Sequence, residues 1–189
     1  MPEKVIARGR VPELFDRNRL SRQIRNIASL PPGGIRVVHL DTSQCSERGD
    51  LNALAVGQIF DRPDGSKELW ILNVEYGRWT PRLLPENICD FLDKWSPYSR
   101  ATIEQIIGSS FLKIILEDTW ERRGQPQPKL LWISSRNAAA KSKKIGRLVR
   151  LSREGKLNLV AGSWNEEWLC EAEKWSGLSS NHGRTDDCL

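Results

Sequence analysis

The sequence has few cysteines, and they show none of the spacings typical of a zinc cage or a disulfide framework. It contains no CxxC pair, and its cysteines lie far apart, at Cys45, Cys89, Cys170 and Cys188. This pattern fits a protein of the reducing cytoplasm. No stretch approaches the roughly 18 to 20 consecutive apolar residues that a membrane-spanning helix needs. The first residues contain no apolar signal-peptide core, so we expect neither membrane insertion nor export.

The composition is that of an ordinary globular protein whose charges are unevenly placed. Hydrophobic residues make up 39% and charged residues 28% of its 189 residues, and this length is sufficient for one well-buried core. Residues 136–156 contain eight Lys or Arg and one acid, whereas residues 165–189 contain six acids and two bases. This arrangement is expected of a protein that holds a polyanion on one surface and metal on another. The alternative for either stretch is a solvated helix face.

Residues 1–34 are expected to be an N-terminal arm or linker, and residues 35–189 the folded domain. The arm is rich in arginine and ends in Pro-Pro-Gly-Gly, which interrupts the chain. Three strands are then predicted, at Ile35–Asp41, Leu51–Phe60 and Lys67–Tyr76. The turn between the last two contains Asp-Gly, a favoured hairpin connection. Short connections between successive strands indicate an antiparallel meander.

Beyond residue 84 the apolar residues recur at helical spacing, and helices alternate with short strands. The predicted order is three strands, then helix, strand, helix, strand and two helices, which indicates an α/β fold with a mixed five-stranded sheet flanked by helices. The later elements are helix 84–95, strand 101–103, a helix that begins at 108–110 and is ended by Gln125-Pro-Gln-Pro128, strand 129–133, helix 141–153 and helix 165–175.

Acidic residues stand at three separate places where a buried element begins or ends. Asp41 ends the first predicted strand, Glu104 follows the fourth, and the doublet Asp186-Asp187 lies near the C-terminus. A carboxylate at the end of a buried strand must be solvated, paired with a positive charge or bound to metal. Each acid alone has an ordinary alternative as a turn former or helix cap. Together they predict a site for one or two hard divalent cations. His39 lies on the same predicted strand as Asp41, and we interpret it as a core histidine with hydrogen-bond partners.

Four stretches together resemble the C-terminal nuclease domain of the large terminase subunit of tailed phages, within the RNase H-like superfamily. They are Val37-Val-His-Leu-Asp41-Thr-Ser43 with Gly49-Asp50, Thr102-Ile-Glu104-Gln, Thr185-Asp186-Asp187, and the basic segment from Lys144 to Leu157. The resemblance covers roughly residues 33 to 189, and it lies in the order and spacing of all four stretches. It implies an RNase H-like nuclease fold.

The resemblance also implies a two-metal mechanism in which carboxylates position two Mg²⁺ or Mn²⁺ ions at the scissile phosphate. Asp41 would bridge both ions, Glu104 would hold one, and either Asp186 or Asp187 would hold the other. Asp50 matches a further acid of the family and is expected to be an auxiliary ligand. Phosphate contacts are expected from a separate set of bases, namely Lys143, Lys144, Arg147 and Arg150.

The activity implied is a metal-dependent endonuclease that cuts double-stranded DNA with little sequence specificity, as when concatemeric viral DNA is cut during genome packaging. A small terminase subunit and a portal protein would be partners in the host cytoplasm. The chain has no Gly-x-x-x-x-Gly-Lys-Ser/Thr motif and so no ATP site, and it ends two residues after Asp187. We therefore expect an excised or incomplete nuclease domain with a truncated C-terminal end.

Two other hypotheses fit the same residues. One is another RNase H-like nuclease, either a resolvase or an RNA–DNA hybrid nuclease, which substrate preference would separate from the first. The other is a catalytically silent DNA-binding or assembly module, which would be indifferent to Asp41→Asn.

Overall fold

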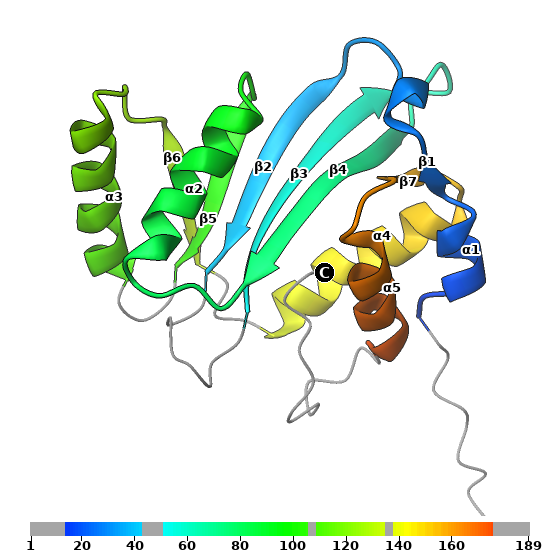
Figure 1. Cartoon of the computed structure of the whole chain (residues 1–189). Coiled ribbons are helices and arrows are strands. Elements are labelled where there is room, and N and C mark those ends of the chain that lie inside the picture. The colour runs from blue at the N-terminus through cyan, green and yellow to red at the C-terminus, as the bar shows by residue number, and fades with distance from the viewer. Residues whose placement is uncertain (1–13, 43–50, 106–108, 135–137, 176–189) are drawn as a thin grey trace, which may run out of the picture.

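A computed structural model describes residues 14–42, 51–105, 109–134 and 138–175 (Figure 1). None of the helices in these ranges is long and apolar enough to cross a membrane. In chain order the elements are α1 (Arg17–Ser21), β1 (Ile24–Arg25), the 3-10 helix η1 (Ile27–Ser29), β2 (Ile35–Asp41), β3 (Asn52–Asp61), β4 (Lys67–Gly77), α2 (Leu83–Lys94), β5 (Arg100–Gln105), α3 (Ser109–Arg123), β6 (Leu130–Ser134), α4 (Ala138–Arg153), β7 (Leu157–Val160) and α5 (Asn165–Lys174).

The described strands form a single mixed sheet in the order β1-β7-β4-β3-β2-β5-β6. β2, β3 and β4 make the antiparallel meander that the sequence predicts, whereas β5 pairs parallel with β2 and with β6. The α/β class is thereby confirmed, but the sheet has seven strands and the sequence predicted five. The two additional strands are β7 and β1. β7 pairs parallel with β4, and β1 pairs parallel with β7.

Two apolar clusters hold helices against opposite faces of this sheet. Val38 and Leu40 of β2 and Ile103 of β5 pack with buried residues of α2 and α3. On the other face, β4 and β7 pack with α1, α4 and α5 in a cluster that includes the fully buried Trp168. Figure 1 shows α2 and α3 at the end of the sheet formed by β5 and β6, and the other helices at the end formed by β7 and β1.

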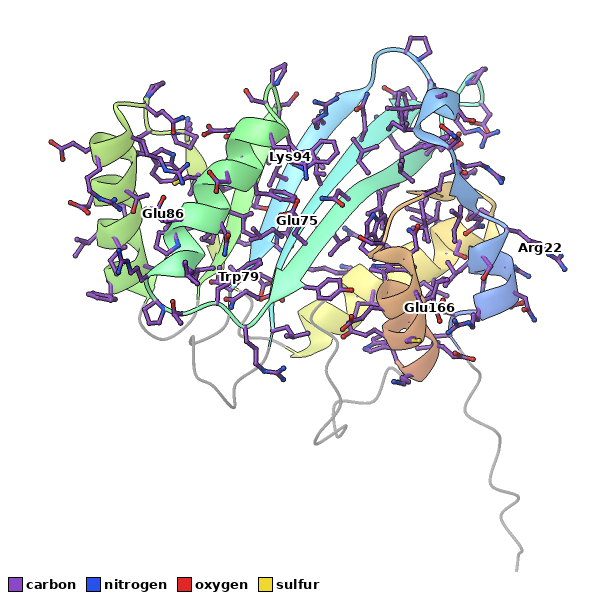
Figure 2. All side chains as sticks on the ribbon, viewed as in Figure 1. Arg22, Glu75, Trp79, Glu86, Lys94 and Glu166 are labelled. Atoms are coloured by element: carbon purple, nitrogen blue, oxygen red, sulfur yellow. The ribbon has the colours of Figure 1, made fainter. Side chains whose placement is uncertain are left out.

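Ion pairs join α2 to α3 and to β4, and Figure 2 labels Glu86, Lys94 and Glu75 among the side chains that make them. Glu86 of α2 pairs with Arg122 of α3 at 3.0 Å and with Arg123 of the same helix. Lys94, in the last turn of α2, pairs with Glu75 of β4 at 2.8 Å. These contacts are partly exposed, so each adds no more than about 1 kcal/mol to stability. Apolar burial is therefore the main force that holds α2 and α3 together.

Part of the segment expected to be an arm packs against the sheet. Phe15 and Leu20 are 3% and 0% exposed and belong to the cluster around α4 and α5. Gln23 donates to the carbonyl of Ser152 at 2.7 Å, which fixes the chain beside the end of α4 before β1 pairs with β7. Residues 14–25 are thus an integral part of this fold, and the domain boundary at residue 34 stays a prediction.

Candidate active site

Asp41 and Glu104 come to the same end of two neighbouring strands. β2 and β5 are parallel, and Leu40 pairs with Ile103 in their register. Asp41 and Glu104 each follow that pair by one residue, so they lie side by side at the carboxyl ends of the strands. Because side chains alternate along a strand, both point to the face opposite Leu40 and Ile103, which are buried under α2 and α3. The fold therefore brings together two of the predicted acids.

The sheet face that carries these acids is only partly covered by the described helices. The cluster under α1, α4 and α5 takes its strand residues from β3, β4 and β7, together with Ile24 of β1. On β2 the side chain of His39 is 41% exposed, and on β6 Leu131 is 50% exposed. Leu131 pairs directly with Thr102, so both lie on the same face as His39 and Glu104. This leaves β2, β5 and β6 accessible beside α4.

Glu104 is largely buried and is paired with a lysine from the basic helix. Its side chain is 13% exposed, and its Oε1 lies 3.0 Å from Nζ of Lys144 in α4. The same oxygen lies 3.9 Å from Nε2 of His39. A carboxylate with so little contact with water needs a nearby positive charge. Lys144 supplies that charge in the described structure.

His39 is held by a hydrogen-bonded chain across β2 and β5. Its Nδ1 lies 2.8 Å from Oγ1 of Thr102, and that hydroxyl donates to the carbonyl of Val38 at 3.1 Å. Burial lowers the pKa of His39; the charge of Glu104 raises it and that of Lys144 lowers it. The histidine is hydrogen-bonded, as the sequence indicated. The prediction that it belongs to the core was wrong, because its side chain is 41% exposed.

The remaining predicted acids lie outside the described residues. These are Asp50, Asp186 and Asp187, so their predicted roles stay predictions. Within the described ranges, no three His, Cys, Asp or Glu side chains are grouped so that they could hold a metal ion. The acids at Asp41 and Glu104 thus form part of the predicted ligand set.

The basic residues predicted to contact phosphate lie along α4. Lys143, Arg147 and Arg150 are exposed, while Ile145 and Val149 are buried against the sheet, as the helical spacing predicts. Arg150 pairs with Glu154 at 3.0 Å. The structure describes no ion pair for Lys143 or Arg147. Of the four predicted bases, these two are therefore exposed and have no ion pair that the structure describes.

The groups at this site fit a divalent cation. Carboxylate oxygens are the ligands that Mg²⁺ and Mn²⁺ prefer, and a positive charge already lies against Glu104 in the form of Lys144.

Sequence reasoning missed two features of the site. The pairing of Lys144 with Glu104 joins residues 40 positions apart, and the sequence places Lys144 only on a basic helix. The role of Thr102 was also missed, although a signal was present. His39 and Asp41 are two residues apart on one predicted strand, as are Thr102 and Glu104, so both pairs share a face of the sheet.

Comparison with known proteins shows similarity in structure alone. No protein-family model and no curated protein sequence matches the chain. The large terminase nuclease of thermophilic phage G20c superposes with a TM-score of 0.58 at 12% identity, covering 93% of this chain and 92% of that one. The nuclease domain of the large terminase subunit of bacterial virus Sf6 superposes with a TM-score of 0.55 at 10% identity, covering 86% and 82%. The predicted likeness to terminase nuclease domains is confirmed at the level of the fold.

Proposed function

We propose that this protein is a metal-dependent endonuclease that cuts double-stranded DNA with little sequence specificity, as when concatemeric viral DNA is cut during genome packaging. One observation carries the proposal: Asp41 and Glu104 lie side by side at the carboxyl ends of β2 and β5, with Lys144 of the basic helix against Glu104. The shared fold with nuclease domains of two phage large terminases supports it.

In this proposal two Mg²⁺ or Mn²⁺ ions are held by Asp41, Glu104 and either Asp186 or Asp187, with Asp50 as an auxiliary ligand. When bound, such ions supply an activated water and stabilise the charge that develops on the phosphate. Asp41 contributes by its place at the end of a central strand, because β2 is paired on both sides and its backbone has little freedom. Glu104 contributes by its low exposure, which strengthens its attraction for cations.

DNA binding in this proposal relies on α4. Lys143 and Arg147 contact backbone phosphates, with Lys144 and Arg150 beside them. Such contacts carry no sequence information, which accounts for cleavage at many sequences. Lys144 belongs to this helix and also reaches Glu104. The distance from the carboxylates to the phosphate that is cut is therefore no more than a lysine side chain can span. In this proposal the ammonium group of Lys144 moves from Glu104 to that phosphate when metal and DNA are bound.

A small terminase subunit and a portal protein are the protein partners we propose, in the cytoplasm of the infected host cell. Both proposals depend on the role in genome packaging. The described residues include no site that identifies either partner.

Cleavage of supercoiled plasmid by the native protein tests the function, with Mg²⁺, Mn²⁺ or EDTA. Glu104→Gln is the test variant, and Glu75→Gln is the matched control. Glu75 is also a strand glutamate paired with a helix lysine, but it lies on the face covered by α2. We expect metal-dependent nicking that Glu104→Gln abolishes and Glu75→Gln retains.

The same assay separates the alternatives when an RNA–DNA hybrid of equal length is included. Preferential cleavage of the hybrid would identify a hybrid nuclease and contradict the packaging role. Salt-sensitive DNA binding without cleavage under any metal condition would identify a silent binding module and contradict the enzymatic proposal.

A further inference from the structure

The hydrogen bonds around His39 favour the tautomer with the proton on Nδ1. The carbonyl of Val38 can only accept, so the hydrogen that it receives at 3.1 Å belongs to the hydroxyl of Thr102. That hydroxyl has one hydrogen, and its oxygen therefore accepts from Nδ1 of His39 at 2.8 Å. In the neutral imidazole, Nε2 then has no hydrogen and presents a lone pair.

This lone pair lies close to a carboxylate. Nε2 of His39 and Oε1 of Glu104 are 3.9 Å apart, and both are acceptors. Two acceptors at such a separation favour a cation between them. The separation is less than the sum of two metal–ligand bonds of about 2.1 Å each, so one ion can contact both atoms. Lys144 Nζ, 3.0 Å from the same Oε1, shows that this oxygen attracts positive charge in the described structure.

The second nitrogen of the ring is placed as it is in metal-binding histidines. A histidine that binds metal through one nitrogen usually donates the other N–H to an oxygen, which fixes the orientation of the ring. Thr102 provides that oxygen, and its own hydroxyl is anchored on the backbone of β2. β2 and β5 are paired directly at His39 and Thr102, so the arrangement rests on the rigid part of the sheet.

We propose that His39 binds the divalent cation of the nuclease centre through Nε2, together with Oε1 of Glu104, and that Thr102 is the residue that positions the ring. This inference rests on the proposed function and adds a nitrogen to a ligand set that the sequence predicted to consist of oxygens. Nitrogen ligands favour first-row transition metals over Mg²⁺. The centre should therefore bind Mn²⁺ more tightly, relative to Mg²⁺, than a site of carboxylates alone.

Mn²⁺ binding to the DNA-free full chain, followed by electron paramagnetic resonance, tests the proposal without relying on activity. His39→Asn places an amide nitrogen near the position of Nδ1, and so can still donate to Thr102, but it lacks Nε2. We expect its Mn²⁺ dissociation constant to rise by more than about 10- to 100-fold, which is the loss typical when only an outer partner of a ligand is removed. Its Mg²⁺ dissociation constant, measured by competition, should rise far less. Pulsed spectra of bound Mn²⁺ should show coupling to an imidazole nitrogen in the native protein and none in His39→Asn.

A pair of variants at Thr102 tests the positioning role. Thr102→Val removes the hydroxyl at nearly constant volume and should weaken Mn²⁺ binding, while Thr102→Ser keeps the hydroxyl and should bind as the native protein does. Equal affinity in both variants would overturn the positioning role. Thermal unfolding of each variant checks that the fold is retained.

The outcomes separate this inference from the proposed function. If the native protein binds Mn²⁺ without nitrogen coupling and His39→Asn binds it equally well, His39 is not a ligand, although a metal-dependent nuclease remains. A spectrum of the native protein that shows bound Mn²⁺ without nitrogen coupling overturns the inference even if His39→Asn does not fold. If the native chain binds no Mn²⁺ and cuts no DNA, both proposals are wrong.

Discussion

Replacing Lys143 and Arg147 of α4 with glutamine should reduce the salt dependence of DNA binding by a defined amount. Each phosphate contact contributes about 0.9 to the slope of log affinity against log salt concentration. Both side chains are exposed, and the structure describes no ion pair for either. Lys144 and Arg150, by contrast, each have a carboxylate partner at 3.0 Å. The double variant should therefore lower the slope by about 1.8, since two full contacts are lost.

This change is large enough to measure. Between about 50 and 200 mM salt, a slope difference of about 1.8 means that the native protein loses roughly tenfold more affinity than the variant. Fluorescence anisotropy of a labelled duplex, titrated in EDTA at several salt concentrations, gives both slopes without cleavage. Lys144→Gln/Arg150→Gln should lower the slope less, because these cations are shared with acids.

The control removes the same charge elsewhere. Lys113 lies on α3, which covers the face of the sheet opposite the carboxylates, and Lys129 directly precedes β6, at the amino-terminal end of a strand parallel to β5. Lys113→Gln/Lys129→Gln should leave the slope unchanged. An unchanged slope in Lys143→Gln/Arg147→Gln, or an equal fall in the control, would refute the assignment of α4 as the DNA-binding surface.

Three further predictions concern single residues. Burial raises the pKa of the Cys89 thiol to about 11. A thiol reagent at pH 8 should therefore leave Cys89 unmodified in peptide mapping, while the part-exposed Cys170 reacts. Labelling of Cys89 in the native protein would contradict its burial. Hydrogen bonds lower the pKa of Glu86, and the one from Arg123 has a larger effect than the one from Arg122. The charged carboxylate therefore stabilises the fold at pH values above its unfolded pKa. This stabilisation is lost as the pH falls through its lower pKa in the folded protein. Glu86→Gln should be about 0.5–1 kcal/mol less stable than the native protein at pH 7 and equally stable near pH 2 in thermal melts; a constant difference would contradict the ion pair. Lys144→Gln should bind Mn²⁺ more tightly in calorimetry because it removes a cation that competes for Glu104; weaker binding would mean that Lys144 supports the site.

The meander and the helices were predictable because each has a strong local pattern. β3 and β4 each contain an apolar run of strand length, and the turn between them places Gly65 at a φ of +75°, a conformation that the predicted Asp-Gly hairpin favours. β7 was left out of the predicted order because it has only four residues and begins shortly after the end of α4, which is too short a stretch for its period to be recognised. β1 has two residues, and only pairing with β7 makes it a strand.

The site was predictable where it depends on the order of elements. Asp41 and Glu104 end strands that become neighbours, and the resemblance to a known nuclease fold indicated this. Their surroundings were not predictable, because the contact of Lys144 with Glu104 depends on how α4 packs over β4 and β7. The exposure of His39 likewise depends on which part of the sheet that helix leaves uncovered.

Asp41→Asn tests the central claim most directly, with Asp61→Asn as its matched control. Asp61 also ends a strand, but it lies at the far end of β3 and pairs with Lys67. Nicking of supercoiled plasmid in Mn²⁺ should be lost in Asp41→Asn and retained in Asp61→Asn, with both variants folded. Nicking by Asp41→Asn at the native rate would mean that the carboxylates at the ends of β2 and β5 are not the centre of a nuclease.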